Sequence, residues 1–170
     1  MASRFIPTVR FKRASTLWWL LFVGGPIVYG AGPWAISLLA PRYGWVDHPG
    51  PWNLIGLIPV AVGATGLIWS VALHVAQGPE AVEMELAKSY LLTRGPYALS
   101  RHPTYLSILT LLLGWVIFYG SVAVFIAFVA GCAFFNIAAR LEERALEARF
   151  GEAYLAYKNK VPRWFGKTRL

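Results

Sequence analysis

Three long stretches of this sequence contain no charged residue, and they constrain the fold more than any other feature. They cover residues 14–41, 48–79 and 102–139. Each stretch exceeds the ~20 residues that cross the hydrocarbon core of a bilayer as a helix. The composition agrees, because 57% of the residues are hydrophobic and 14% are charged, against roughly 45–50% and 25% in soluble proteins. The chain is therefore predicted to be an integral membrane protein.

The apolar blocks within these stretches differ in their expected shape. The first, 17–40, contains Gly24-Gly25-Pro26 and Gly32-Pro33, which predicts either one kinked span or a broken pair of helices. The second, 52–76, fits one full helix. The third is nearly twice the usual length and carries a Tyr119-Gly120-Ser121 turn near its middle, which predicts a helical hairpin. The expected fold class is an all-α, polytopic membrane helical bundle of about four to five transmembrane helices.

The distribution of basic residues predicts the orientation. Four Lys or Arg residues precede the first block, three lie between residues 77 and 101, eight follow Ala139, and only Arg42 lies elsewhere. The positive-inside tendency then places the N-terminus, the 77–101 loop and the C-terminus in the cytoplasm, which requires an even number of crossings, and four spans satisfy it. The net charge is +8. The basic residues that produce it flank the apolar blocks, which favours membrane lipids as partners over nucleic acid.

The sequence contains no repeat or linker that would separate two domains. We expect one membrane domain, 1–170, with N-terminal spans (14–76), a cytoplasmic loop (77–102), the hairpin (103–139) and an amphipathic tail (140–170). The middle of the loop, 80–87, is a possible short helix. In the tail, apolar residues recur at helical spacing between Leu146 and Val161, although Gly151 allows a bend or two shorter helices. Pro162 ends the helix, and Trp164 and Phe165 are expected anchors at the membrane interface.

Two polar segments bracket the hairpin, 95–105 and 140–144. Because a hairpin returns its second end close to its first, Arg101, His102 and Tyr105 are expected near Arg140, Glu142 and Glu143. Pro103 suits the first position of a helix, whose free N–H groups favour an anionic group. A glutamate nearby can hold a cation or accept hydrogen bonds from a ribose. The combination suits a zwitterionic ligand. The lone Cys132 indicates neither a disulfide nor a metal cluster, and no metal site is predicted.

These segments also carry a family resemblance. Residues 95–105 read GPYALSRHPTY, and residues 142–163 read EERALEARFGEAYLAYKNKVPR. In this order and at this spacing they resemble the isoprenylcysteine carboxyl methyltransferase and phospholipid methyltransferase family. The resemblance covers roughly residues 89 to 165 and implies a membrane methyltransferase that uses S-adenosyl-L-methionine. Carried over position by position, it implies cofactor contacts at Leu91, Leu92, Tyr97, His102, Pro103, Tyr105 and Glu142.

The residues expected to bind the methyl acceptor match the family less closely than those expected to bind the cofactor. The family often has an arginine four residues before the first glutamate, where this chain has Ala138. Either Arg140 takes that role or the substrate differs. Methyl transfer from a sulfonium gains most from alignment and exclusion of water. A carboxylate acceptor, as in a prenylated cysteine, needs no base, whereas a phospholipid amine must lose a proton.

The expected catalytic residues are therefore Arg140 and Glu143, with His102 as a second candidate base. Arg101 and Arg163 are expected to bind substrate, although Arg163 could equally bind a lipid phosphate. His74, near the cytoplasmic end of the second block, is expected to be structural or to snorkel toward the interface.

Two other functions remain open. A membrane reductase of the steroid-reductase type would bind a nicotinamide dinucleotide, whose 2′-phosphate would need more basic residues than the Lys88 and Arg94 inside the loop. A non-enzymatic scaffold would leave the converging polar residues unexplained. No pattern indicates an oligomeric state.

Overall fold

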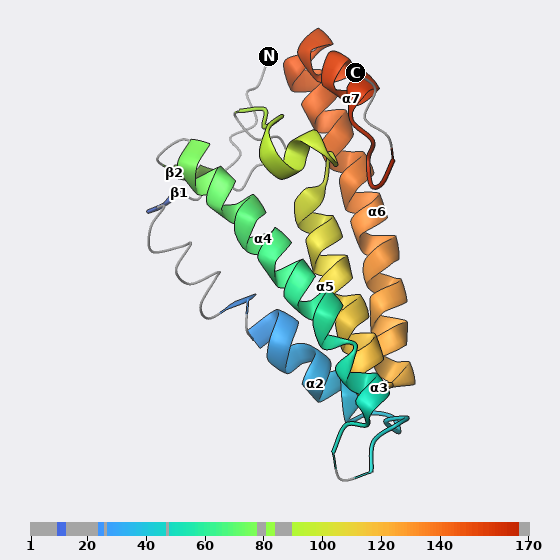
Figure 1. Cartoon of the computed structure of the whole chain (residues 1–170). Coiled ribbons are helices and arrows are strands. Elements are labelled where there is room, and N and C mark those ends of the chain that lie inside the picture. The colour runs from blue at the N-terminus through green and yellow to red at the C-terminus, as the bar shows by residue number, and fades with distance from the viewer. Residues whose placement is uncertain are drawn as a thin grey trace, which may run out of the picture.

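The structure is a computed structural model that describes residues 10–12, 24–25, 27–46, 48–77, 81–83 and 90–166. Three long helices lie side by side and make up most of it (Figure 1): α4 (Leu57–Gln77), α5 (Pro103–Tyr119) and α6 (Val122–Phe150). At one end lie α2 (Gly32–Ser37) and α3 (Pro51–Leu54). At the other lie the 3₁₀ turn η3 (Gly95–Ala98) and α7 (Glu152–Lys160). The all-α prediction is confirmed for this bundle.

A short ribbon of two strands was not predicted. Strand β1 (Arg10–Lys12) pairs antiparallel with β2 (Ala81–Glu83), with Phe11 opposite Val82. The helix expected over 80–87 is therefore wrong at Ala81–Glu83, and the rest of that range lies outside the described residues. A strand satisfies its backbone groups on a partner segment, here one about 70 residues away in sequence. A local pattern gives no signal for such a partner.

Two helices of the described part are long and apolar enough to cross a membrane, Pro51–His74 and Val122–Phe150. The apolar helix α5 has 17 residues, the lower limit for a span. In α6 only 11% of the most apolar window is buried inside the protein. Most of its apolar surface therefore faces outward, as expected for a helix in contact with lipid tails.

Small residues bring α4 and α5 unusually close together. A Cβ added to Gly63 would lie 2.5 Å from the Leu111 backbone nitrogen and 2.6 Å from the Ser107 carbonyl oxygen. A Cβ added to Gly114 would lie 2.6 Å from the Gly56 carbonyl oxygen. Such contacts are too short for real side chains, so the two backbones touch only because glycine occupies these positions.

The predicted helical hairpin is confirmed. Helix α5 ends at Tyr119, and Gly120 adopts the left-handed conformation, with φ of 55°, before Ser121 begins the next helix. Glycine adopts this conformation without steric cost. Asn53 supports the turn by donating from Nδ2 to the Ile117 carbonyl at 3.2 Å.

The first apolar block is described only from Gly24, apart from Pro26. There the chain forms a π-helical turn, η2 (Ile27–Ala31), that leads directly into α2. Gly32 and Pro33 therefore lie at the start of α2 rather than at a break. The residues before Gly24 that the kinked-span and two-helix alternatives involve lie outside the described residues.

The tail forms two helices, which was one of the two expected alternatives. Gly151, with φ of 52°, separates α6 from α7. The apolar residues of the tail pack inward to form a small core, which Leu91 and Phe150 partly cover. Its buried members are Leu146, Tyr154, Tyr157 and Val161. The tail thus folds back onto the bundle at the end where α5 begins.

Candidate functional site

The site is built around the N-terminus of α5. His102 is the N-cap residue and Pro103 opens the helix, as the sequence predicts. The His102 side chain does not cap the helix. Instead its backbone N–H donates to Ser100 Oγ at 3.2 Å, and Ser100 Oγ donates to the Arg163 carbonyl at 2.8 Å. The imidazole is thereby left to face α6, and the residue is 5% exposed.

Glu143 is the electrostatic centre of the site. Its carboxylate lies 3.1 Å from Arg101 Nη2 and 3.2 Å from His102 Nε2. Arg163 donates to it twice, from Nε at 2.8 Å and from Nη2 at 2.6 Å. Three basic side chains from two distant segments therefore meet one buried carboxylate, which is 3% exposed. A buried carboxylate requires such partners, because leaving it unpaired costs several kcal/mol.

Glu142, one residue earlier, faces a different set of groups. Tyr105 donates its hydroxyl to Glu142 Oε2 at 2.9 Å, and His102 Nδ1 lies 3.5 Å from the same oxygen. The His102 and Tyr105 rings stack with centroids 5.4 Å apart and planes 3° from parallel. His102 thus contacts both glutamates, one through each ring nitrogen.

This double contact changes the acidity of His102. Burial disfavours the charged imidazolium, but the hydrogen bonds to Glu142 and Glu143 and the charges of both carboxylates outweigh it, so the pKa of His102 is raised. The raised pKa widens the pH range in which the ring is protonated, and the protonated ring donates from both nitrogens.

The segment after α7 closes the site. Arg101 N–H donates to the Pro162 carbonyl at 2.9 Å, and Trp164 lies against His102 with ring centroids 5.7 Å apart. Tyr157 donates its hydroxyl to the Tyr97 carbonyl at 2.6 Å. The loop before α5 and the tail after α6 therefore form one unit, at the same end of the bundle (Figure 1).

The other predicted cofactor residues lie on the loop side of this unit. Leu92 is buried, and Leu91 packs against the core formed by the tail. Tyr97 is 7% exposed, and its hydroxyl bonds to Thr104 at 3.1 Å and to His74 at 2.6 Å. Burial raises the pKa of Tyr97, and the negative charge of Glu142 raises it further against the opposing effect of the Thr104 hydrogen bond.

Among the described charged residues predicted for the site, Arg140 alone lies outside the ion pairs of Glu142 and Glu143. Its neighbour Ala139 and Glu143, one turn later, are buried, whereas Arg140 is exposed. Within the described part of the chain it forms no ion pair. The helical rotation of about 100° per residue turns it away from the face that carries Ala139 and Glu143.

Sequence analysis missed several residues that the structure brings to the site. Ser100 lies within the first motif segment. Trp164 directly follows the second and was predicted as an anchor at the membrane interface, not as a neighbour of His102. His74 was expected to be structural or to snorkel, and no sequence pattern indicated that both of its ring nitrogens bond to tyrosine hydroxyls. Thr104 lies within the first motif segment, and no role was predicted for it.

A cavity of about 500 Å³ lies between η2, α4 and α5. Its size is within the ~300–1,000 Å³ that small-molecule sites occupy. Most of its wall is apolar, and Thr104 lies at the end nearest the site. The lining residues are Gly24, Gly25, Val28, Tyr29, Gly30, Ala64, Leu67, Ile68, Val71, Thr104, Ile108 and Leu111.

Comparison with known proteins agrees with this arrangement. The family model described as phospholipid methyltransferase matches residues 52–153, more than half of the chain. The match includes α4, α5, the loop between them and, in α6, Glu142 and Glu143. No curated protein matches the sequence. The chain therefore belongs to the phospholipid methyltransferase family and is a membrane methyltransferase.

Proposed function

We propose that the protein transfers a methyl group from S-adenosyl-L-methionine to a lipophilic or membrane-embedded acceptor at the cytoplasmic face of the membrane. The observation that carries the proposal is the position of Glu142. Its carboxylate is held by Tyr105 at 2.9 Å beside the N-terminus of α5, and its side chain is 15% exposed. A carboxylate next to a helix N-terminus offers opposite charges within one small region.

That region suits the two ends of the proposed cofactor. The free N–H groups at the start of α5 would receive the carboxylate of its amino-acid part. Glu142 would bind its ammonium group or accept hydrogen bonds from its ribose. The remaining contacts would come from Leu91, Leu92, Tyr97, His102, Pro103 and Tyr105. When bound, the sulfonium supplies an activated methyl group, and the protein's own task is to orient it and exclude water.

Glu143 fits a positioning role better than that of a base. Both of its oxygens are occupied by basic partners, Arg101, His102 and Arg163. These contacts fix His102 against Glu142 and hold the tail over the site. Arg101 and Arg163 would meet an anionic part of the substrate only at the edge of this cluster. Arg140, exposed on α6, would contact an acceptor that approaches from outside the cluster.

The acceptor class follows from the surroundings of the site. The cavity beside Thr104 is lined mostly by aliphatic side chains and glycine, and apolar walls bind apolar chains. The group that accepts the methyl could be either the carboxylate of a prenylated cysteine or the amine of a phospholipid, because both molecules carry an apolar chain. Lipid-facing helices on both sides would allow such a molecule to enter from the bilayer.

The proposed topology is multi-pass, with both termini in the cytoplasm. It is supported by 15 of 16 Lys and Arg residues lying in the segments expected on one side. Helix α5, a mostly apolar helix of 17 residues, would be a crossing besides the two longer helices, since it returns the chain from the site to the turn at Gly120. Membrane lipids would then be the chain's immediate partners.

Calorimetric titration of the detergent-purified protein with S-adenosylhomocysteine tests the proposal, with a reduced nicotinamide dinucleotide titrated in parallel. Saturable binding of S-adenosylhomocysteine alone is the expected result. Binding of the dinucleotide instead would assign a reductase, and binding of neither would remove the cofactor site from the proposal.

A further inference from the structure

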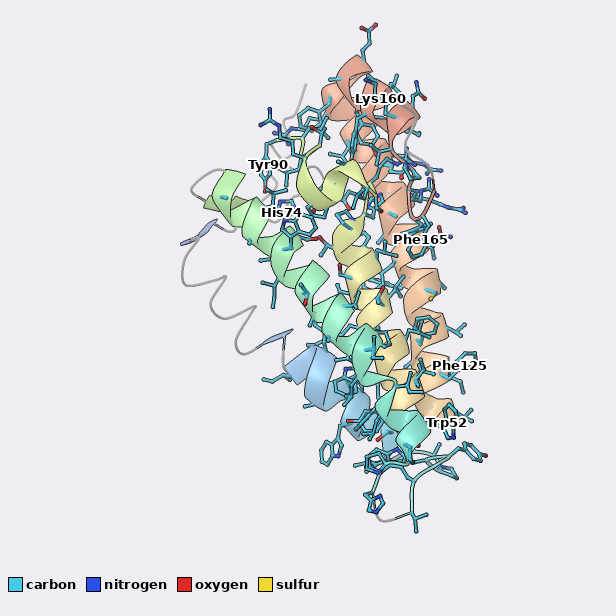
Figure 2. All side chains as sticks on the ribbon, viewed as in Figure 1. Trp52, His74, Tyr90, Phe125, Lys160 and Phe165 are labelled. Atoms are coloured by element: carbon cyan, nitrogen blue, oxygen red, sulfur yellow. The ribbon has the colours of Figure 1, made fainter. Side chains whose placement is uncertain are left out.

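Four side chains form a continuous row of hydrogen bonds beside the site, which we name the His74 row. Tyr90 Oη lies 2.7 Å from His74 Nδ1, and His74 Nε2 lies 2.6 Å from Tyr97 Oη. Tyr97 Oη lies 3.1 Å from Thr104 Oγ1. Figure 2 shows His74 and Tyr90 next to each other at the loop end of α4. The row thus runs from the start of α5 to the loop.

The inner end of the row meets the cavity. Thr104 belongs both to the row and to the cavity wall. On α4 the wall includes Leu67 and Val71, and His74 is the next residue on that helical face, three positions later. Among the lining residues only Thr104 and Tyr29 carry a polar side-chain group. The cavity therefore has an apolar body and, at Thr104, a polar end connected to a histidine.

The same end of the cavity lies next to the proposed cofactor site. Tyr97, whose hydroxyl bonds to Thr104, also accepts a hydrogen bond at its carbonyl from Tyr157 of the tail that closes the site. Tyr105, which holds Glu142, follows Thr104 directly in α5. A group at Thr104 would therefore be close to both the row and Glu142.

We propose that the His74 row is the route by which a protonated amine acceptor loses its proton, and that the acceptor is an amphiphile whose single apolar chain fills the cavity. This inference rests on the proposed methyl transfer. An ammonium group has no free electron pair and must lose one proton before it can attack. After that loss, the nitrogen pair forms the N–C bond, the C–S bond breaks, and its electron pair remains on sulfur as the thioether.

One tautomer of His74 allows the proton to move in a single direction. Thr104 Oγ1 takes the proton from the ammonium and donates its own to Tyr97, and Tyr97 Oη donates to His74 Nε2. His74 Nδ1–H donates in turn to Tyr90, through which the proton leaves the row on the side of the loop. Every group in the row then donates once and accepts once, as a hydroxyl or a neutral imidazole can. His74 is the only member of the row whose ordinary pKa lies near neutrality.

Several titratable groups face the row from the elements packed against it. Besides Tyr90, His74 and Tyr97, which belong to the row itself, they are Tyr105 of α5, Glu142 of α6 and, on the cavity wall, Tyr29 of η2. Among these described groups, only the Glu142 carboxylate is charged near pH 7.

Methylation of dodecylamine by the full chain in detergent, followed as a function of pH, tests the inference. In the His74→Gln variant, transfer near pH 7.5 should fall by about 100-fold, within the ~10²–10⁴ that positioned proton transfer contributes. The rate should recover as the pH approaches ~10, where an alkylammonium loses its proton to water unaided. The His48→Gln variant is the matched control, because His48 is exposed at the opposite end of the chain's fold.

Two further pairs of variants separate the row from the cavity. Thr104→Val should lower the rate with the same recovery at high pH, whereas Thr110→Val should not, because Thr110 only bonds to its own helix at Leu106. Ala64→Phe should fill the cavity and raise KM for dodecylamine about 10-fold. Ala61→Phe, one turn earlier on an exposed face, should leave KM unchanged.

The outcomes are decisive in either direction. An unchanged pH profile in His74→Gln would overturn the inference, and so would a rate that stays low at every pH while S-adenosylhomocysteine still binds. If the unaltered protein binds S-adenosylhomocysteine but does not methylate dodecylamine, the amine route is wrong and the proposed methyl transfer stands. If the unaltered protein binds no S-adenosylhomocysteine, the proposed function itself has failed.

Discussion

His102 is the residue through which the parts of the site depend on one another. Its backbone is held by Ser100, its ring stacks on Tyr105, and its two nitrogens face two different glutamates. A ring fixed in this way restricts the Glu142 carboxylate, which also accepts a hydrogen bond from the Tyr105 hydroxyl. The arrangement explains why a histidine followed by proline is needed here: proline starts the helix, and the residue before it is turned out of the helical conformation toward α6.

Replacement of Glu142 tests the cofactor site at a single residue. Glu142→Ala should weaken S-adenosylhomocysteine binding about 10- to 100-fold, because a hydrogen bond to a charged group contributes roughly 1.5–3 kcal/mol. Calorimetric titration measures the change. Glu152→Ala removes an exposed carboxylate from the first turn of α7 and should leave the affinity unchanged. Equal affinities for the two variants would contradict the assignment of Glu142.

The raised pKa of His102 predicts a pH dependence of stability. The folded protein binds this proton more tightly than the unfolded chain, so the contribution is fully present below the ordinary pKa of about 6.5 and is lost as the pH rises through the raised pKa of the folded state. The free energy of unfolding should therefore decrease with rising pH in that window. Thermal unfolding of His102→Gln should show a flatter dependence there, and a slope identical to that of the unaltered protein would count against the prediction.

At the scale of elements, the contact between α4 and α5 determines where the site and the cavity lie. The two helices approach closely at Gly63 and Gly114, and they diverge toward the loop, where Thr104 and His74 face each other through Tyr97. Close backbone packing is favourable in a bilayer, where burial of apolar side chains gives no advantage over contact with lipid. The same pair of helices therefore provides both the packing and the wall of the cavity.

Two glycines within helices allow a matched test of this packing. Gly63→Ala should destabilise the protein by about 1–3 kcal/mol, as overpacking does, because its Cβ would meet the backbone of α5. Gly131→Ala should be neutral or stabilise it by up to about 1 kcal/mol, since its Cβ would meet Leu112 at an ordinary 3.7 Å and alanine favours helix. Thermal unfolding in detergent measures both. Similar unfolding temperatures for the two variants would mean that α4 and α5 can move apart at no cost.

At the scale of the whole molecule, the site exists only because the loop before α5 and the tail after α7 close on each other. The tail supplies the Arg163 side chain to Glu143, the Trp164 ring to His102 and the Pro162 carbonyl to Arg101. These segments are about 60 residues apart in sequence. The bundle carries them to the same end because the hairpin of α5 and α6 turns the chain back at Gly120 (Figure 1).

Truncation of the chain tests this closure. A chain that ends at Lys160 keeps all the long helices but loses Arg163 and Trp164, so it should lose detectable binding of S-adenosylhomocysteine. Its helical content by circular dichroism should stay close to that of the full chain. A chain that ends at Gly166 retains both residues and should bind normally. Normal binding by the shorter chain would show that the tail covers the site without forming part of it.

The sequence by itself determined the features that depend on local composition and spacing. Charge-free blocks predict apolar helices, the turn at Gly120 predicts the hairpin, and Gly151 predicts a possible division of the tail. The hairpin in turn predicts that His102 and Tyr105 meet Glu142 and Glu143, and the contacts confirm it. In each case the physical cause lies within a few neighbouring residues or in the single hairpin turn at Gly120.

Only the tertiary structure decided the features that depend on which face of a helix meets which neighbour. Arg140 and Glu143 are three residues apart, yet one is exposed and the other is buried among three basic groups. His74 lies in an apolar block with no nearby motif, and its partners come from a loop whose path the sequence does not specify. The pairing of β1 with β2 is of the same kind. Such contacts are fixed by the packing of distant segments, because the groups that satisfy a buried polar atom need not be near it in sequence.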